Sequence, residues 1–406
     1  MFFEKAIPEK ARDAYRRDAW AGMLGGIYTG AIFPFVAFIA RDQLHASVTL
    51  ISLMMAAPFI GSMFALFYAH AMEGRRKLPY VVWSTITARA LFFFMLFATT
   101  PLRFVLIVAA VQAIATIAGP AYSAVLKEIY PDEHRGRIMA YIRVGLAFAT
   151  FAATLLVGQI LKHHVLNFRF VFPIAALIGI MATLSFSTIK TAPVDPDDPD
   201  NSRASIIPFL KNTLAIFKED RDYTWFALSI FVFGFGNMLA SPLYPIFQVD
   251  RLHISASQVA MLSNVAAVVW MFSYFYWGKY VDIQSPLKAT MINVLLICLV
   301  PLIYFLAKNV WMLIPAAVVS GVVTSGLELS YFNGILFFAK DGRESHYQAL
   351  HSFLLGIRGT IAPFCGAAMI TLFRGQGIDV KFVFLISMSI MLLGGVLQTV
   401  GVKRRY

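Results

Sequence analysis

Charge is scarce in this chain of 406 residues, of which 14% are charged and only 22 are Asp or Glu. Soluble globular domains carry roughly 25% charged residues, so the composition excludes an ordinary soluble domain. Cysteine is nearly absent as well. Cys298 and Cys365 both fall inside apolar runs, and neither predicts a disulfide or a metal site.

Motifs for catalysis and cofactor binding are also missing. The sequence contains no Walker-type phosphate loop, no His-Glu-x-x-His, no Gly-x-Ser-x-Gly and no Cys/His set at metal-binding spacing. We therefore expect a protein that uses no metal or cofactor and is not an enzyme. The first seventeen residues are charged and lack the apolar core of a signal peptide, so we expect the first span to act as its own signal.

Apolar sequence is what the chain has in abundance, at 59% of its residues. A run near 20 residues can cross a hydrocarbon core about 30 Å thick, and in lipid a helix is the form in which such a run satisfies its own backbone. The sequence therefore predicts an all-α membrane protein with twelve transmembrane helices. The predicted spans cover residues 18–40, 47–70, 79–100, 103–127, 137–160, 168–190, 224–247, 256–280, 287–307, 310–338, 346–372 and 380–402.

Lys and Arg gather on one side of these spans, before the first span and in residues 75–77, 127–137, 190–221 and 403–405. Cytoplasmic loops retain positive charge, so both termini are expected in the cytoplasm, with the protein in the inner (plasma) membrane of a bacterium. This bias and the attraction to anionic lipid account for the formal charge of +12. The charge therefore gives no reason to expect nucleic-acid binding.

The second half of the chain repeats the first at a shift of 208 positions. Each half also carries six of the predicted spans, and a duplicated six-span unit is a known plan for moving solutes across membranes. We therefore predict two pseudo-symmetric six-helix bundles. The matching residues are Gly26, Pro34, Asp42, Leu44, His45 and Ser47 in the first half, and Gly234, Pro242, Asp250, Leu252, His253 and Ser255 in the second.

A polar stretch separates the two halves, and its Pro193 to Asp200 portion alternates Pro and Asp, which favours a solvated linker. After it, apolar and basic residues recur at helical spacing and predict an amphipathic helix on the cytoplasmic membrane face, which tethers the halves. Its residues are Ile207, Leu210, Leu214 and Phe217 with Lys211, Asn212 and Lys218. The predicted organisation is a bundle over 1–190, a cytoplasmic linker over 191–223 and a bundle over 224–406.

Two cytoplasmic loops carry parts of one motif. Gly74-Arg75-Arg76-Lys77 follows the second span, with Ala71 where an Asp is usual, and Gly278 and Asp282 follow the eighth. With the twelve spans and the repeat, these residues resemble the major facilitator superfamily over nearly the whole chain. The resemblance implies a gating role for Gly74, Arg75, Gly278 and Asp282, where Gly278 lets a helix approach and Asp282 meets the end of a helix. The alternative is a solvated surface turn.

Charged residues inside the spans are the first candidates for function. Glu328 is the one acidic residue deep in a predicted span, and a buried carboxylate can take up and release a proton as its access to water alternates. We predict that Glu328 couples transport to protons. A structural ion pair with Arg89, Arg143 or Arg358, the three arginines inside spans, is the alternative. Arg143 and Arg358 are also predicted to attract an anionic group of the substrate.

Polar residues three or four positions apart share a helix face, and they form stripes on the fourth, seventh and tenth spans. The resemblance implies that these spans, with the first, line the central cavity. Ordinary hydrogen bonding between helices is the alternative for each residue. The predicted substrate-binding residues are Thr29, Gln112, Thr116, Asn237, Tyr244, Thr324, Tyr331, Arg143 and Arg358.

These features predict a secondary active transporter, a monomer in the lipid bilayer that moves a small organic solute by alternating access and is driven by protons or another ion. One alternative is a proton-coupled efflux pump for hydrophobic compounds. The fifth span lacks the Gly-x-x-x-Gly-Pro pattern typical of such drug antiporters, which disfavours it. Another alternative is a receptor or scaffold that transports nothing, because a fold does not dictate a function.

Overall fold

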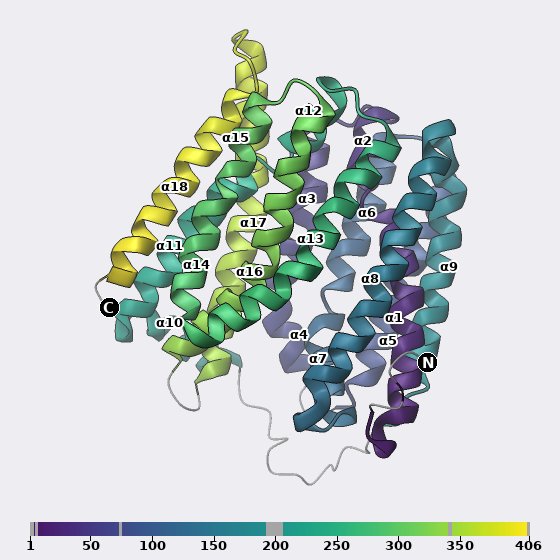
Figure 1. Ribbon diagram of the computed structural model, residues 1–406, viewed down its shortest axis with the longest axis vertical. Coiled ribbons are helices and arrows are strands. Elements are labelled where there is room, and N and C mark those ends of the chain that lie inside the picture. Colours follow the sequence, from purple (N-terminus) through teal and green to yellow (C-terminus); the bar gives the residue numbers. More distant parts are fainter. Residues whose placement is uncertain (1–3, 5–6, 73–74, 192–205, 340–342, 404–406) are drawn as a thin grey trace. The chain divides into compact units, whose positions relative to one another are not determined.

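The computed structural model describes residues 4, 7–72, 75–191, 206–339 and 343–403, and in these residues the secondary structure is helical (Figure 1). The first half contains η2 (Glu9–Ala11), α1 (Arg12–Ile32), α2 (Val36–Asp42), α3 (Val48–Met63), α4 (Ala65–Met72), α5 (Leu78–Ala90), η3 (Leu91–Phe97), α6 (Pro101–Ala115), α7 (Ala118–Ile129), α8 (Asp132–His163), η4 (Val165–Asn167) and α9 (Phe168–Ser187). The second contains α10 (Ile206–Glu219), α11 (Arg221–Leu239), α12 (Leu243–Asp250), α13 (Ala256–Ile283), α14 (Pro286–Ile297), α15 (Leu299–Leu306), η6 (Val310–Leu313), α16 (Ile314–Phe338), α17 (Glu344–Gly375) and α18 (Phe382–Lys403).

Eleven helical segments within the described residues are long and apolar enough to cross a membrane. The predicted second span, 47–70, is divided at Phe64 into α3 and α4, and its longer piece has 16 residues. Large side chains also point outward, with Trp83, Phe148 and Phe275 exposed. Exposed aromatic residues on this scale are typical of a lipid-facing surface. The all-helical, multi-span membrane fold is therefore confirmed.

The chain forms two compact units. Unit 1 comprises residues 1–46, 64–203 and 255–260, and unit 2 comprises 47–63, 204–254 and 261–406. The two units divide the predicted linker 191–223 between them after residue 203, and they exchange two helical segments, because α3 belongs to unit 2 and the start of α13 belongs to unit 1.

Small residues at the helix contacts account for the placement of α3 in unit 2 and of the start of α13 in unit 1. An added Cβ at Gly356 or Gly359 of α17 would collide with Met63 or Phe59 of α3, so these glycines let the two helices pack closely. Gly158 of α8 does the same for Ala260. Close packing at small residues is a common way for helices to associate in membranes.

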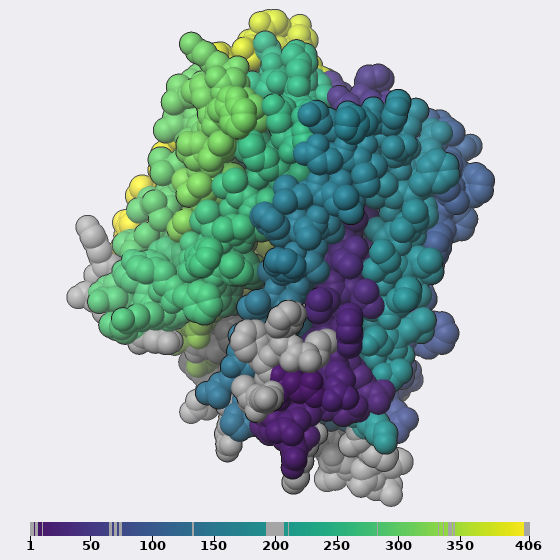
Figure 2. All heavy atoms as spheres, turned by 45° about the vertical axis from the view of Figure 1, so that its right-hand side comes forward, coloured from purple at the N-terminus to yellow at the C-terminus, as the bar shows by residue number. Residues whose placement is uncertain are grey.

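The helices inside each unit follow the sequence repeat. In unit 1, α1 packs along α8 and α9, and Figure 2 shows this purple helix beside the teal helices of the same unit. In unit 2, α11 packs in the same way along α17 and α18. Each of these helices lies about 208 positions after its counterpart in unit 1. The duplication therefore extends from the sequence to the packing inside each unit.

The repeated residues also build the same turn twice. His45 and His253, which are related by the repeat, both have a left-handed backbone, with φ of 51° and 48°. The next amide bonds back to the preceding helix in each half, from Ala46 to the Ala40 carbonyl at 2.8 Å and from Ile254 to the Gln248 carbonyl at 3.2 Å. Histidine adopts this conformation more readily than most residues, and it ends both helices without a glycine.

Candidate functional site

Unit 1 contains a pocket of about 460 Å3 that brings charged side chains together between apolar helices. It lies between α1, α5, α8, α9 and the α6–α7 segment. Glycine and alanine on α1 and on the α6–α7 segment form much of its wall, which leaves space between the helices. Its polar and charged lining consists of Asp18, Thr29, Thr85, Arg89, Tyr122, Arg143 and Thr183.

Asp18 is the buried acid of this pocket, with 3% of its surface exposed. The Tyr130 hydroxyl donates to its Oδ2 at 2.9 Å, and no cationic side chain of the described chain forms an ion pair with it. Burial raises the pKa of Tyr130, so this phenol stays protonated and able to donate. Tyr130 follows α7 directly and precedes Pro131. The hydrogen bond therefore links the pocket to the loop between α7 and α8.

Arg89 lies on the other side of the same pocket and is held by neutral groups. Its Nη1 donates to the Gly179 carbonyl and to Thr183 Oγ1, and its guanidinium lies 4.8 Å from the centre of the Tyr28 ring. Within the described residues, no carboxylate pairs with Arg89. The pocket therefore contains a fixed positive charge that no acid of the described residues pairs with.

Two of the predicted binding residues, Thr29 and Arg143, line this pocket, and Arg143 is exposed. Gln112 and Thr116 are half-buried on the neighbouring helix face, where the Thr116 hydroxyl donates to the Ala113 carbonyl at 2.7 Å. The α6–α7 segment instead contributes Ala115, Ala118 and Gly119 to the pocket wall. The pocket is thus lined by Thr29 and Arg143, whereas Gln112 and Thr116 on the fourth span are not part of its lining.

In unit 2, Arg358 lies inside the bundle with 4% of its surface exposed. It donates to the Ile230 carbonyl of α11, next to Gly234, where an added Cβ would collide with its guanidinium. The rings of Tyr331 and His351 lie beside it. Among the described residues, Glu328 does not pair with Arg358.

The remaining candidates of unit 2 lie on three helices, α11, α12 and α16. Glu328 and Thr324 are exposed on α16. Tyr244 packs its ring against Tyr304 and Phe384, with centroids 4.6 and 5.3 Å away, and Asn237 is half-buried on α11. The pocket of about 520 Å3 in unit 2, described below, does not include these residues.

The predicted gating residues are described only in part. Gly74 lies outside the described residues, and the Asp282 side chain is likewise not described. Arg75 is exposed and donates to the Tyr80 hydroxyl at 3.1 Å. An added Cβ at Gly278 meets no atom of the described chain within 4 Å, and the gating role of this residue stays a prediction.

The sequence pattern did not single out Asp18 or Tyr122, and it indicated Arg89 only as a possible ion-pair partner of Glu328. Asp18 is the first residue of the predicted span 18–40, and an aspartate at the start of an apolar run is the signal in the sequence that points to it. Arg89 lies on the third predicted span, which is not one of the four spans expected to line the central cavity. In the structure, α5 packs against α9, so Arg89 reaches the Gly179 carbonyl from this helix.

Comparisons with known proteins extend these observations. The family model described as Major Facilitator Superfamily matches residues 19–338 and 226–405. No curated protein matches the chain.

Solved structures share the fold at low sequence identity. A mutant form of the nucleoside transporter NupG has a TM-score of 0.75 and 12% identity, over 96% of this chain and 99% of that one. A bacterial homolog of the human lysosomal transporter Spinster, in an inward-facing and occupied conformation, has a TM-score of 0.71 and 13% identity, over 96% of both chains. The predicted family is therefore confirmed: the chain belongs to the Major Facilitator Superfamily, whose members are membrane transporters and not enzymes.

Proposed function

We propose that this protein is a secondary active transporter that moves a small organic solute by alternating access, coupled to protons. The observation that supports this most strongly is the pocket of unit 1, whose lining includes the three charged residues Asp18, Arg89 and Arg143. Charged groups inside a membrane protein are costly to bury, so they mark solute and ion pathways.

The size and lining of the pocket suit a small solute. Ligand pockets generally measure roughly 300 to 1,000 Å3, and this one measures about 460 Å3. Arg89 and Arg143 supply positive charge, whereas Thr29 and Tyr122 offer hydroxyl groups. This lining favours a solute with an acidic or strongly hydrogen-bond-accepting group next to an apolar part.

The other predicted binding residues remain part of the proposal. Arg358 and Tyr331 are neighbours inside unit 2, which supports a shared role for them. We also propose seven solute-binding residues that do not line the pocket of unit 1, namely Gln112, Thr116, Asn237, Tyr244, Thr324, Tyr331 and Arg358.

For coupling, we propose two carboxylates. Glu328 is exposed on α16, so its carboxylate can exchange a proton with water. Asp18 is buried in the pocket, with the Tyr130 hydroxyl as a hydrogen-bond donor that tolerates either protonation state of the acid. A proton on Asp18 would change the charge that the solute meets in the pocket, which is a direct physical route from proton binding to solute affinity.

The proposed class of solute rests on the residues that line the pocket and not on the fold. The similar structures are those of a nucleoside transporter and of a homolog of a lysosomal transporter, at 12% to 14% identity. One fold can host many substrates, so these names do not select one for this chain.

The orientation is also a proposal. Lys and Arg are concentrated in residues 1–17 and in the 75–77 and 127–137 loops, which supports cytoplasmic termini in a bacterial inner membrane. We also propose that the protein works as a monomer. Labelling of single cysteines at residues 76 and 163 with a membrane-impermeant reagent in intact cells tests this orientation. We expect only residue 163 to react, and labelling of residue 76 alone would reverse the topology.

The function is tested with the purified protein in proteoliposomes. A panel of solutes, acidic and neutral, is first screened for thermal stabilisation of the protein, and each hit is then assayed for flux with and without an imposed pH gradient. We expect at least one acidic or polar hit to accumulate only when the gradient is present. Broad competition among hydrophobic compounds would favour the efflux pump, and binding without flux under any gradient would favour a receptor.

A further inference from the structure

The helix α10 presents two different faces to its surroundings. Its inner face packs on unit 2, where Thr213 and Ile216 are buried and the Phe209 ring stacks on His346 with centroids 4.3 Å apart. Arg343, just before α17, pairs with Glu219 at 2.6 Å. These contacts attach α10 to the start of α17.

The outer face of α10 alternates apolar and basic residues. Ile207, Lys211, Leu214 and Lys218 follow one another at spacings of three and four, and all four side chains are exposed, Ile207 by 72% and Leu214 by 51%. Exposed leucine and isoleucine between lysines are typical of a helix that lies in the headgroup region of a membrane. The position agrees, because α11, a membrane-spanning segment, begins at Arg221, two residues after α10 ends.

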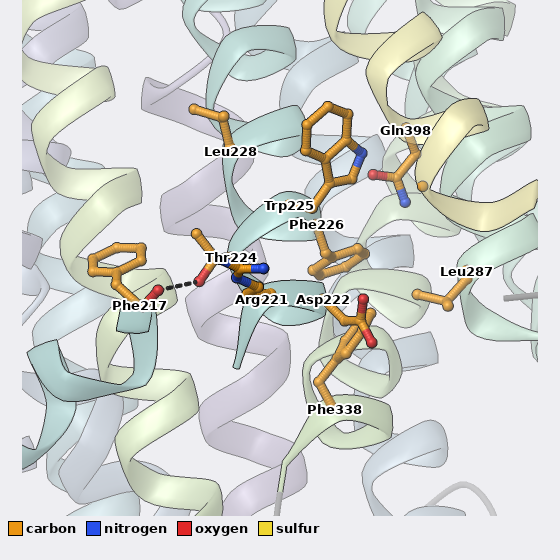
Figure 3. Close-up of a pocket in the computed structure, with 11 residues that line it drawn as sticks. Phe217, Arg221, Asp222, Thr224, Trp225, Phe226, Leu228, Leu287, Phe338 and Gln398 are labelled. Atoms are coloured by element: carbon orange, nitrogen blue, oxygen red, sulfur yellow. Dashed lines mark hydrogen bonds between the residues drawn. The ribbon is translucent and has the colours of Figure 1, made fainter. Parts of the chain in front are cut away.

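A pocket of about 520 Å3 lies beside this helix, where α10 and α11 meet α14, α16 and α18. Along α11, Arg221, Trp225 and Leu228 line it at spacings of four and three. Figure 3 shows Arg221 at the start of α11, with Trp225 and Leu228 further along the helix. From the end of the span inward, the lining thus changes from a cation to an indole and then to an aliphatic side chain.

The indole in this pocket is held in place. Trp225 Nε1 donates to the Leu397 carbonyl of α18 at 2.8 Å, and an added Cβ at Gly401 would collide with the ring. Arg221, in contrast, is exposed and bonds to no other residue of the described chain. The pocket therefore combines a fixed apolar wall with an available cation at its mouth.

The acidic groups nearby do not cancel this positive charge. Glu219 is paired with Arg343, and Asp220 accepts from the Tyr223 amide and the Tyr347 hydroxyl. Asp222 also lines the pocket, and its carboxylate would repel a phosphate. Lys211, Lys218 and Arg221 outnumber it.

We propose that the outer face of α10 and the adjoining pocket bind an anionic phospholipid of the leaflet that faces α10. Lys218 and Arg221 would hold the phosphate, and an acyl chain would lie along Trp225 and Leu228. The order of cation, indole and aliphatic side chain matches the order of phosphate, ester region and hydrocarbon along a phospholipid. The inference depends on the membrane location of the chain and is independent of the solute and of the coupling ion.

The test uses the full-length protein in nanodiscs of phosphatidylcholine with a fixed fraction of brominated lipid, which quenches nearby tryptophan. We expect brominated phosphatidylglycerol to quench more than brominated phosphatidylcholine, and Trp225→Phe to remove this excess. Each basic residue near a membrane surface adds about a fivefold preference for anionic lipid, so the Lys218→Gln/Arg221→Gln variant should lose the excess. The matched control, Lys127→Gln/Lys279→Gln, changes two lysines that are exposed outside the site and should keep it.

A second measurement does not depend on tryptophan. Native mass spectrometry of the protein released from mixed-lipid micelles counts the lipids that stay bound. We expect at least one phosphatidylglycerol more on the unchanged protein than on Lys218→Gln/Arg221→Gln. Equal quenching by both brominated lipids, an excess that survives in Trp225→Phe, or equal lipid retention by the two proteins would each overturn the proposal.

Discussion

The Tyr130 hydroxyl donates a hydrogen bond to the Asp18 carboxylate at 2.9 Å, across 112 positions of the chain. Both residues are almost fully buried, and Asp18 also lines the pocket of unit 1. The pair therefore connects the first helix of the unit to the loop between α7 and α8 through one charged group.

This hydrogen bond should contribute to stability. Tyr130→Phe leaves the Asp18 carboxylate buried without its donor, which costs about 1 to 3 kcal/mol and should lower the melting temperature in detergent. Tyr276→Phe is the control, because Tyr276 is exposed and its hydroxyl bonds to no residue of the described chain. Asp18→Asn in the Tyr130→Phe background should recover part of the loss, since a neutral amide is cheaper to bury. Purely additive effects of the two changes would argue against the pairing.

The packing of Arg358 against Gly234 should make this glycine irreplaceable. Gly234→Ala places a methyl group on the guanidinium, and overpacking of this kind costs about 1 to 3 kcal/mol. Gly278→Ala is the matched control in α13, where the new methyl group meets nothing within 4 Å of the described chain. It should be neutral or stabilising by up to about 1 kcal/mol, because alanine favours a helix. Equal melting temperatures for the two variants would show that Arg358 moves aside.

Proton coupling should depend on Glu328. Glu328→Gln removes the titrating group and keeps the shape, so accumulation driven by a pH gradient should be lost, whereas exchange of solute at equal pH should remain. A pH-sensitive dye inside proteoliposomes measures the accompanying proton movement. Glu9→Gln, at an exposed residue near the N-terminus, is the control. If Glu328→Gln still accumulates solute and Asp18→Asn does not, the coupling role passes to Asp18.

Solute affinity should depend on Arg143. A hydrogen bond to a charged group is worth about 1.5 to 3 kcal/mol, so Arg143→Gln should raise the KM for an acidic solute by roughly tenfold to a hundredfold. Arg76→Gln removes an exposed arginine outside the pocket and should leave KM unchanged. Arg89→Lys keeps the charge but not the geometry held by Gly179 and Thr183, and should give an intermediate value. Unchanged KM in Arg143→Gln for every transported solute would remove this residue from the site.

The turns at His45 and His253 show that the sequence repeat predicted the same local backbone structure in both halves. The two residues were paired only by their distance in the sequence, and both adopt the left-handed conformation with the same backward hydrogen bond. This agreement arises because a helix end is determined by residues within one or two turns of it. The division of the second span at Phe64 is equally local, but hydropathy alone did not predict it.

The sequence by itself determined the class of the molecule, eleven of its spans and its internal duplication, because hydropathy and helical spacing act over short stretches of chain. Only the tertiary structure decided which charges meet. Asp18 and Tyr130, and Arg89 and Gly179, are brought together by helices distant in sequence, while Arg358 is directed to Ile230 and not to Glu328. Such pairings depend on how small residues allow helices to approach, as Gly234 does for Arg358. Spacing along one helix carries no information about this contact.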